Sequence, residues 1–302
     1  MKRRRENTHA HYTPSNPHCP PPFLFQDRFE SLAYFSSTGP TPDGRTKPDL
    51  VAPGTTVSAF SDGDPASANC GLGVDRGTSM ATPVAAGAAL LARQYFLEGW
   101  HVGGAPDASV AMAKPSSALL RAVLLGGTAP MRGVRPSNGG AVDGAPLEVG
   151  PSEGGPSASV GHGRLHLGRA LPLAPLNVSA WGLAVSDGTL LRTQGAVSRF
   201  CVRAAGGARP LSVTLAWTDP PPSPSAATPL VNDLDLVVTS EALGGYPRRG
   251  NGGAGADRAN TVERVWLESG GGTGGGEIVI TVTAARLPAP PQAFALAVHV
   301  SG

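Results

Sequence analysis

The segment GTSMATP, residues 77–83, places a serine between small residues at the start of a long apolar stretch. Ser79 has two interpretations there. It can cap the helix that the apolar stretch forms, because serine is a preferred residue at a helix N-terminus. It can also be a nucleophile, because Gly77 lets a substrate backbone approach closely and the N–H groups of a helix N-terminus stabilise an oxyanion. The residue types alone leave both interpretations open.

Four oxygen-bearing side chains form a second group, and its chemistry would be cation binding. They are Asp219, Asn232, Asp233 and Asp235. Calcium takes several oxygen ligands, and carboxylates that converge from loops supply them. The alternative is that Asp233 and Asp235 are solvated or edge-guarding charges along a strand. The spacing by itself favours the solvated charges.

Two helices are expected around and after the serine. Residues 78–97 are apolar on nearly every side, which is typical of a helix buried in a core. Pro83 lies near the start of that helix, where proline is tolerated best. Residues 117–127 predict a shorter helix that a serine caps at one end and a glycine pair closes at the other. Before Ser79, the segments SLAYFSS and DLVAPGTTVSAF predict short strands with a break at a Pro-Gly pair.

The hydrophobic period changes to two after about residue 172. Apolar residues alternate in LSVTLAW, and the same pattern continues in DLDLVV, TVERVWL, EIVITVTA and AFALAVHV. Several short strands with turns between them predict an antiparallel sandwich or a jelly-roll-like barrel. The expected fold is therefore the end of an α/β domain over 31–172, followed by an all-β domain over 173–302. Residues 1–30 show no periodicity, and we expect them to be a disordered tail.

Bulk composition argues against two classes of partner. A net charge of +2 over 302 residues lacks the basic surplus of a dedicated nucleic-acid binder. No apolar run approaches the roughly 20 residues of a membrane helix. We therefore expect neither nucleic acid nor a membrane as a partner, and the oligomeric state stays open. The N-terminus is basic without an apolar core, so it is not expected to be a signal peptide.

Several segments together resemble one family. GTSMATPVAAG resembles the serine signature of the subtilisin-like serine proteases (subtilases, peptidase family S8), and FSSTGPTPDGRTKPDLVAPG resembles the segment before that signature. GHGRLHLGRAL resembles the stretch that closes the catalytic domain of this family. SVTLAWTDPP, LVNDLDLVV, NTVERVWL and PQAFALAV resemble the C-terminal β-barrel of its alkaline, oxidatively stable branch. The resemblance covers about residues 31–302.

The resemblance implies a function and a set of site residues. Ser79 would be the nucleophile of an Asp, His, Ser triad, and its own N–H would contribute to the oxyanion hole. The substrate would be a polypeptide, and the compartment would be extracellular by family analogy. The resemblance also implies structural Ca²⁺ at Asp219, Asn232, Asp233 and Asp235. Two further acids, Asp257 and Glu263, could join that site.

The sequence departs from the family before the serine. Only about 30 residues precede Ser31, and they contain His9, His11, His18 and Asp27 without a DTG- or HGTH-like motif. We therefore expect the triad's Asp and His to be missing from this chain, and the chain to be the C-terminal part of a longer protease. A serine hydroxyl without a base is a weak nucleophile, so the isolated chain is expected to be nearly inactive. The alternative is an inactive fragment or pseudo-protease whose β-barrel acts as a binding or stabilising module.

Overall fold

The structure is a computed structural model of the 302-residue chain. It describes residues 31–61, 70–131, 134–137, 141–146, 155–173, 181–203, 210–226, 228–240, 245–252, 255–267 and 277–301. The expected tail over 1–30 lies outside the described residues.

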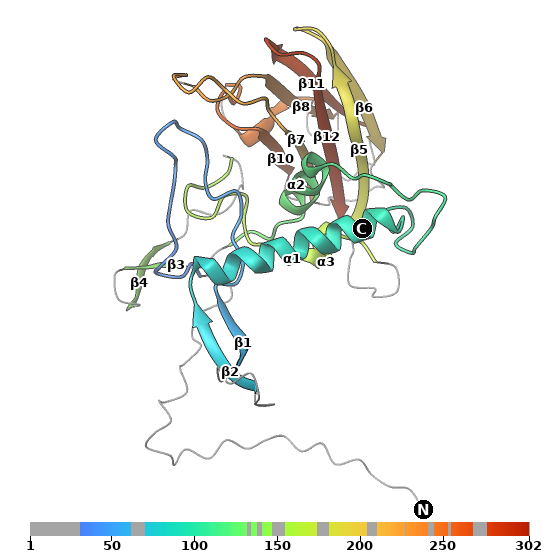
Figure 1. The fold of residues 1–302 in the computed structure, drawn as a ribbon. Helices are drawn as coiled ribbons and strands as arrows, with labels where there is room; N and C mark the ends of the chain where they lie inside the picture. Colours follow the sequence, from blue (N-terminus) through green and yellow to red (C-terminus); the bar gives the residue numbers. More distant parts are fainter. Residues whose placement is uncertain are drawn as a thin grey trace, which may run out of the picture.

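The part of the chain before residue 174 contributes helices and two hairpins. The helices are α1 (Thr78–Leu97), α2 (Ser117–Gly126) and the short α3 (Leu167–Ala170). The antiparallel hairpins pair β1 (Thr55–Ser61) with β2 (Cys70–Arg76), and β3 (Val134–Ser137) with β4 (Ala141–Pro146). The β1–β2 hairpin projects away from the other elements next to the start of α1 (Figure 1). Within the described residues, parallel pairing is limited to one isolated bridge between Val51 and Arg164.

The rest of the chain forms two antiparallel four-stranded sheets. One sheet has the order β10-β7-β12-β5 and the other β6-β11-β8-β9. Their strands are β5 (Trp181–Leu191), β6 (Val197–Arg203), β7 (Leu211–Trp217), β8 (Asp233–Ser240), β9 (Arg248–Arg249), β10 (Val262–Leu267), β11 (Glu277–Arg286) and β12 (Gln292–Ser301), with a 3₁₀ turn, η3, over Gly250–Gly252. The antiparallel, sheet-rich C-terminal region that the period-two pattern predicts is therefore confirmed.

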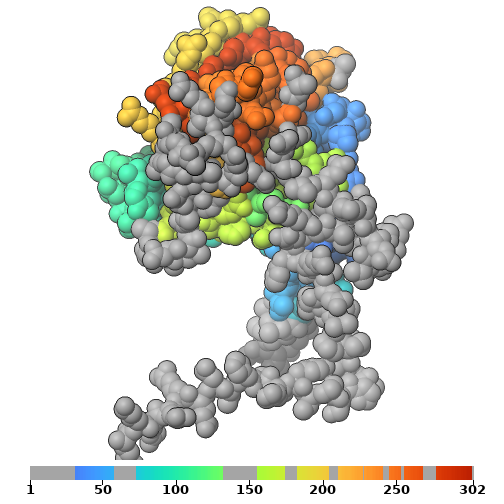
Figure 2. Space-filling view, turned by 180° about the vertical axis from the view of Figure 1, so that it is seen from behind, coloured from blue at the N-terminus to red at the C-terminus, as the bar shows by residue number. Residues whose placement is uncertain are grey.

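The main hydrophobic core lies between these two sheets. Strands of one sheet contribute Leu215, Trp217 and Phe294, and strands of the other contribute Leu236 and Ile280, all of them almost completely buried. Alternate residues of each strand supply this core because successive side chains of a strand point to opposite faces. The two sheets thus form a sandwich, which occupies one end of the molecule in the space-filling view (Figure 2).

Helix α2 covers the outer face of the β10-β7-β12-β5 sheet. Its side chains share a second hydrophobic cluster with Ala216, Ala295 and Ala297, which are the outward-facing residues of β7 and β12. Every residue of β7 is buried for this reason, although its sequence alternates between apolar and small or polar residues. The helix begins as expected, because Ser116 is the N-cap and its Oγ accepts the Leu119 N–H at 3.0 Å.

Helix α1 departs from its expected environment. The helix exists with the expected bounds, but its buried residues are only Ala88, Ala92, Tyr95 and Phe96. Leu90 and Leu91 are 69% and 52% exposed, so the prediction that this helix is buried all round is wrong in this structure. The strand expected over SLAYFSS is also absent: residues 31–37 are irregular apart from a turn at Tyr34 and Phe35.

None of the helices in the described ranges combines the length and the apolar character needed to cross a lipid bilayer.

At Gly126, helix α2 lies too close to the sheet for a larger residue to fit. A Cβ at this position would lie 2.6 Å from His299 Nδ1 and 2.9 Å from Thr214 Oγ1, both on fully buried side chains. Gly126→Ala is therefore expected to destabilise the chain by about 1–3 kcal/mol through overpacking. Gly87→Ala in α1 is the matched control, because a Cβ there meets nothing within 4 Å, and alanine is the better helix former by about 1 kcal/mol. Urea unfolding of both variants measures the difference, and equal effects would contradict the close approach.

Candidate active site and acidic cluster

Ser79 lies in the first turn of α1 with its side chain exposed. The N-cap of the helix is Gly77, with φ 153° and ψ 167°, and no side chain caps this end of the helix. The capping interpretation of Ser79 is therefore wrong for this helix. The glycine has a positive φ that side chains disfavour, which explains why this residue type stands two positions before the serine.

Backbone hydrogen bonds bring three distant segments together at this site. The Gly77 N–H donates to Gly54 O at 2.8 Å, which joins the serine turn to the segment that ends in VAPG. The Val51 N–H donates to Gly163 O at 3.0 Å, and the Leu165 N–H donates to Val51 O at 2.8 Å. The three segments that carry the family resemblance in the first half of the chain therefore form one continuous structure.

Ser79 lies beside the backbone N–H groups at the start of α1. The first N–H groups of an α-helix have no partner within the helix, and they carry a partial positive charge. Among the residues that the structure describes, however, Ser79 Oγ makes no hydrogen bond to a histidine or a carboxylate. His101 packs on the Phe96 ring at the other end of α1, and His299 Nε2 lies 3.2 Å from Ala170 O. The N-terminal His9, His11, His18 and Asp27 lie outside the described residues.

Asp219 and Asn232, two of the expected calcium ligands, make internal hydrogen bonds instead. The Asp219 carboxylate accepts the backbone N–H groups of Val231 at 2.6 Å and Asn232 at 2.8 Å. The Asn232 side-chain amide donates to Ala289 O and to Gln292 Oε1, both at 2.8 Å, and its Oδ1 accepts the Ala289 N–H. These contacts fix the loop between β7 and β8 against the turn before β12.

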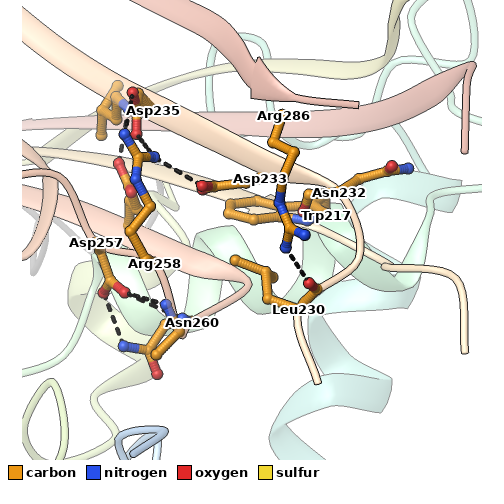
Figure 3. A network of polar contacts seen from close by, with 12 residues as sticks. Trp217, Leu230, Asn232, Asp233, Asp235, Asp257, Arg258, Asn260 and Arg286 are labelled. Carbon is orange, nitrogen blue, oxygen red and sulfur yellow. Dashed lines mark hydrogen bonds and ion pairs between the residues drawn. The ribbon is translucent and has the colours of Figure 1, made fainter. Parts of the chain in front are cut away.

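Asp233 and Asp235 bind an arginine (Figure 3). Arg258 Nη1 lies 2.7 Å from Asp233 Oδ2 and 2.6 Å from Asp235 Oδ1, and Arg258 Nη2 lies 3.3 Å from Asp235 Oδ2. Asp233 is buried, and its Oδ1 has no hydrogen-bond partner within the described residues. Calcium needs six to eight oxygen ligands, and nearly all the oxygens of the four expected residues already accept hydrogen bonds.

As they lie, the four residues do not fit a calcium site. No group of three or more His, Cys, Asp or Glu side chains in the described ranges is arranged to hold a metal ion. Calcium therefore stays a prediction from the sequence. Arg258 was missed by sequence reasoning, because no local signal shows that it reaches strand β8, more than 20 residues earlier in the chain.

Two further acids lie beside this cluster, Asp257 and Glu263, and their pKa values are shifted in opposite directions. Asp257 accepts hydrogen bonds from the side chains of Asn251 and Asn260 and from two backbone N–H groups, and its pKa is lowered although burial opposes this shift. Glu263 Oε2 accepts the Leu236 N–H at 2.6 Å while Oε1 has no partner in the described part of the chain. Burial raises the pKa of Glu263 to about 9, so this side chain is protonated at neutral pH.

Arg258→Gln is expected to lower the free energy of unfolding by about 1–3 kcal/mol, because it leaves Asp233 as an uncompensated buried charge. Arg248→Gln, at an exposed position on β9, is the control. Thermal melts with calcium and with EGTA test the metal directly. We expect no EGTA effect on the parent chain and a partial calcium rescue of Arg258→Gln. A lower melting midpoint of the parent chain in EGTA would contradict the role given to Arg258.

Glu263→Gln is expected to flatten the dependence of stability on pH. The folded chain keeps the Glu263 proton up to about pH 9, whereas an ordinary glutamate has a pKa of 4.5. Because the unfolded chain releases this proton first, stability falls as pH rises from about 4.5 to about 9. Because one pH unit is worth about 1.4 kcal/mol, the stability of the glutamine variant relative to the parent should rise by about 4 kcal/mol from pH 5 to pH 8. Urea unfolding at pH 5 and pH 8 measures this difference in stability. Glu277→Gln, at an exposed position, is the control. A difference between variant and parent that does not grow with pH would contradict the raised pKa of Glu263.

Comparisons with known proteins support the family resemblance of the segment around Ser79. The model of the "Subtilase family" matches residues 27–129, which include Ser79. Three proteins of Dictyostelium discoideum, described as serine protease/ABC transporter B family proteins tagD, tagA and tagB, are 32%, 30% and 29% identical over 70%, 68% and 92% of this chain. The chain spans only 13%, 11% and 17% of the length of these relatives. The family match and the relatives together show that the chain belongs to the subtilase family.

Proposed function

We propose that this chain carries the serine half of a subtilisin-like serine endopeptidase, with Ser79 as the nucleophile. The observation that carries the proposal is the exposed serine in the first turn of α1, two residues after a positive-φ glycine that is hydrogen-bonded to the VAPG segment. Residues 31–172 would then be the end of the subtilisin-like α/β domain. The sandwich that follows would be its C-terminal β domain.

The proposed reaction is hydrolysis of a peptide bond through an acyl-enzyme. Ser79 Oγ would attack the carbonyl carbon while its proton passes to a base, and the carbonyl oxygen would become an oxyanion next to the first N–H groups of α1. Collapse of this intermediate would break the C–N bond, and the base would return the proton to the leaving amine. Water would then release the acyl group by the same steps in reverse.

The base of this reaction is proposed to come with the triad's Asp and His from polypeptide outside this chain. Exposed apolar side chains on two elements of this part of the chain support this. Leu90 and Leu91 of α1 and Val57 and Val74 of the β1–β2 hairpin are all more than half exposed. Large exposed apolar side chains that form a patch are typical of a protein contact. The segment that supplies the base would cover this surface.

A second candidate is a non-catalytic protein whose β-sandwich is a binding or stabilising module. The observation that favours it is that Ser79 has no base among the described residues. Under this proposal the serine turn is only a structural remnant of the family. The two candidates differ in the reactivity of Ser79 itself.

A fluorophosphonate probe followed by peptide mapping separates these candidates. We expect selective but slow labelling of Ser79, on the order of 10⁴–10⁶-fold below an active serine protease, because the base is missing. Ser79→Ala should abolish the labelling. Ser117→Ala is the matched control, since this serine also lies at the start of a helix. Labelling of Ser79 no faster than of Ser117 would reject the nucleophile, and labelling at the rate of an active protease would reject the missing base.

A further inference from the structure

A cavity of about 450 Å³ lies between the two halves of the molecule. Its walls come from the loop around Lys47, from α2, from the connection between β7 and β8, and from the segment that leads into β10. The Thr46 N–H donates to Asn260 Oδ1 at 2.8 Å beside it, which ties the loop to the β domain. In Figure 2 the blue residues of this loop lie directly beside the orange residues of the β domain. The volume is within the range of pockets that bind small molecules.

One wall of the cavity is cationic. Arg45 and Lys47 line it, and each is already paired with a carboxylate, Asp43 and Asp49 respectively. Arg121 is different. Its guanidinium donates to Trp217 O at 3.3 Å and to Thr261 Oγ1 at 3.0 Å, and within the described residues it has no carboxylate as a hydrogen-bond partner. Burial lowers the pKa of Arg121 and the charge of Asp49 opposes this shift, so an anion that contacts the guanidinium would stabilise its charge further.

His162 gives a second sign of positive potential at this cavity. It lines the wall, is 3% exposed, and its Nδ1 has no hydrogen-bond partner in the described part of the chain. Its pKa is held well below the ordinary value by burial and by the charges of Arg264, Arg121 and Lys47. Three cations, Arg45, Lys47 and Arg121, and two carboxylates, Asp49 and Asp219, line the cavity, so positive charge is in excess at its wall.

Part of the lining is apolar. It consists of the prolines that follow β7 and of Leu230 and Val262. A bare inorganic anion would leave this wall uncovered. The combination of an excess of cationic side chains with an apolar surface fits an acidic group attached to an apolar body.

We propose that the cavity binds a small organic oxyanion, whose acidic group contacts Arg121 and Lys47 and whose apolar body packs on the proline wall. The site is separate from Ser79, so it does not depend on the proposed protease function. Phenyl phosphate is a suitable probe because it combines both features. Inorganic phosphate lacks the apolar body, and benzyl alcohol lacks the charge.

Isothermal titration of the full chain with these three compounds tests the proposal. Phenyl phosphate should bind saturably, inorganic phosphate at least tenfold more weakly, and benzyl alcohol without measurable affinity. Arg121→Gln and Lys47→Gln should each weaken phenyl phosphate binding about tenfold, which is the loss expected for a charge-assisted hydrogen bond. Arg93→Gln, on the exposed side of α1, and Ser79→Ala should bind like the parent chain.

The variants also distinguish binding from folding. Arg121 holds Trp217 and Thr261, so its loss can weaken the fold, whereas Lys47 lies in a partly exposed loop and serves as the second test. The His162 imidazole signal in NMR is a further readout, since a bound anion should raise its pKa in the parent chain and not in Arg121→Gln. Equal affinity of the parent, Lys47→Gln and Arg93→Gln would overturn the proposal, as would equal affinity for phenyl phosphate and inorganic phosphate.

Discussion

The packing of helix α2 against the back of the β10-β7-β12-β5 sheet is the contact on which the rest of the structure depends. Seven of the ten residues of this helix are buried. One side of it meets the alanines of β7 and β12, and the other meets Ala92 and Phe96 of α1. Because these neighbours are mostly small, the backbone of the helix lies close to the sheet. The serine-bearing segment and the sandwich are therefore joined by a single shared core.

A buried arginine completes this contact from the side of the sheet. Arg264 of β10 donates through Nη1 to Leu125 O and Thr128 Oγ1, both at 2.6 Å, and to His162 O at 3.2 Å. Its position at the C-terminal end of α2 suits a cation, because the last carbonyl groups of a helix carry partial negative charge. Burial still lowers the pKa of Arg264 to about 9. Its neighbour Glu263 points to the opposite face, into the sandwich, as alternation along a strand requires.

Neighbouring residues in the sequence predict where helices and strands form. What packs against a helix or strand depends on residues that are distant in the sequence. The cap at Ser116, the end of α2 at its glycine pair and the alternating strands all follow from neighbouring residues, and the structure confirms them. Burial of α1 was predicted wrongly because apolar residues show what a helix can bury and not which partner is present. The acidic cluster shows the same limit. Its carboxylates are visible in the sequence, but the contact with Arg258 depends on how β8 and the loop before β10 meet.

The two halves of α1 differ in how well they are packed, and the candidate nucleophile lies in the less buried half. The buried residues of α1 begin at Ala88, and of the first ten residues of the helix, which include Ser79, Val84 packs against the core and is itself only partly buried. Their position depends on the backbone contact between Gly77 and Gly54 and on the continuity of the helix. Segments with few buried contacts open at a lower free-energy cost than the core does. A polypeptide that covers the first half of α1 would therefore order the serine turn at the same time as it supplies a base. When that polypeptide binds, the reactivity of Ser79 and the order of the serine turn are expected to rise together. The packing of α2 on the sheet is expected to stay unchanged.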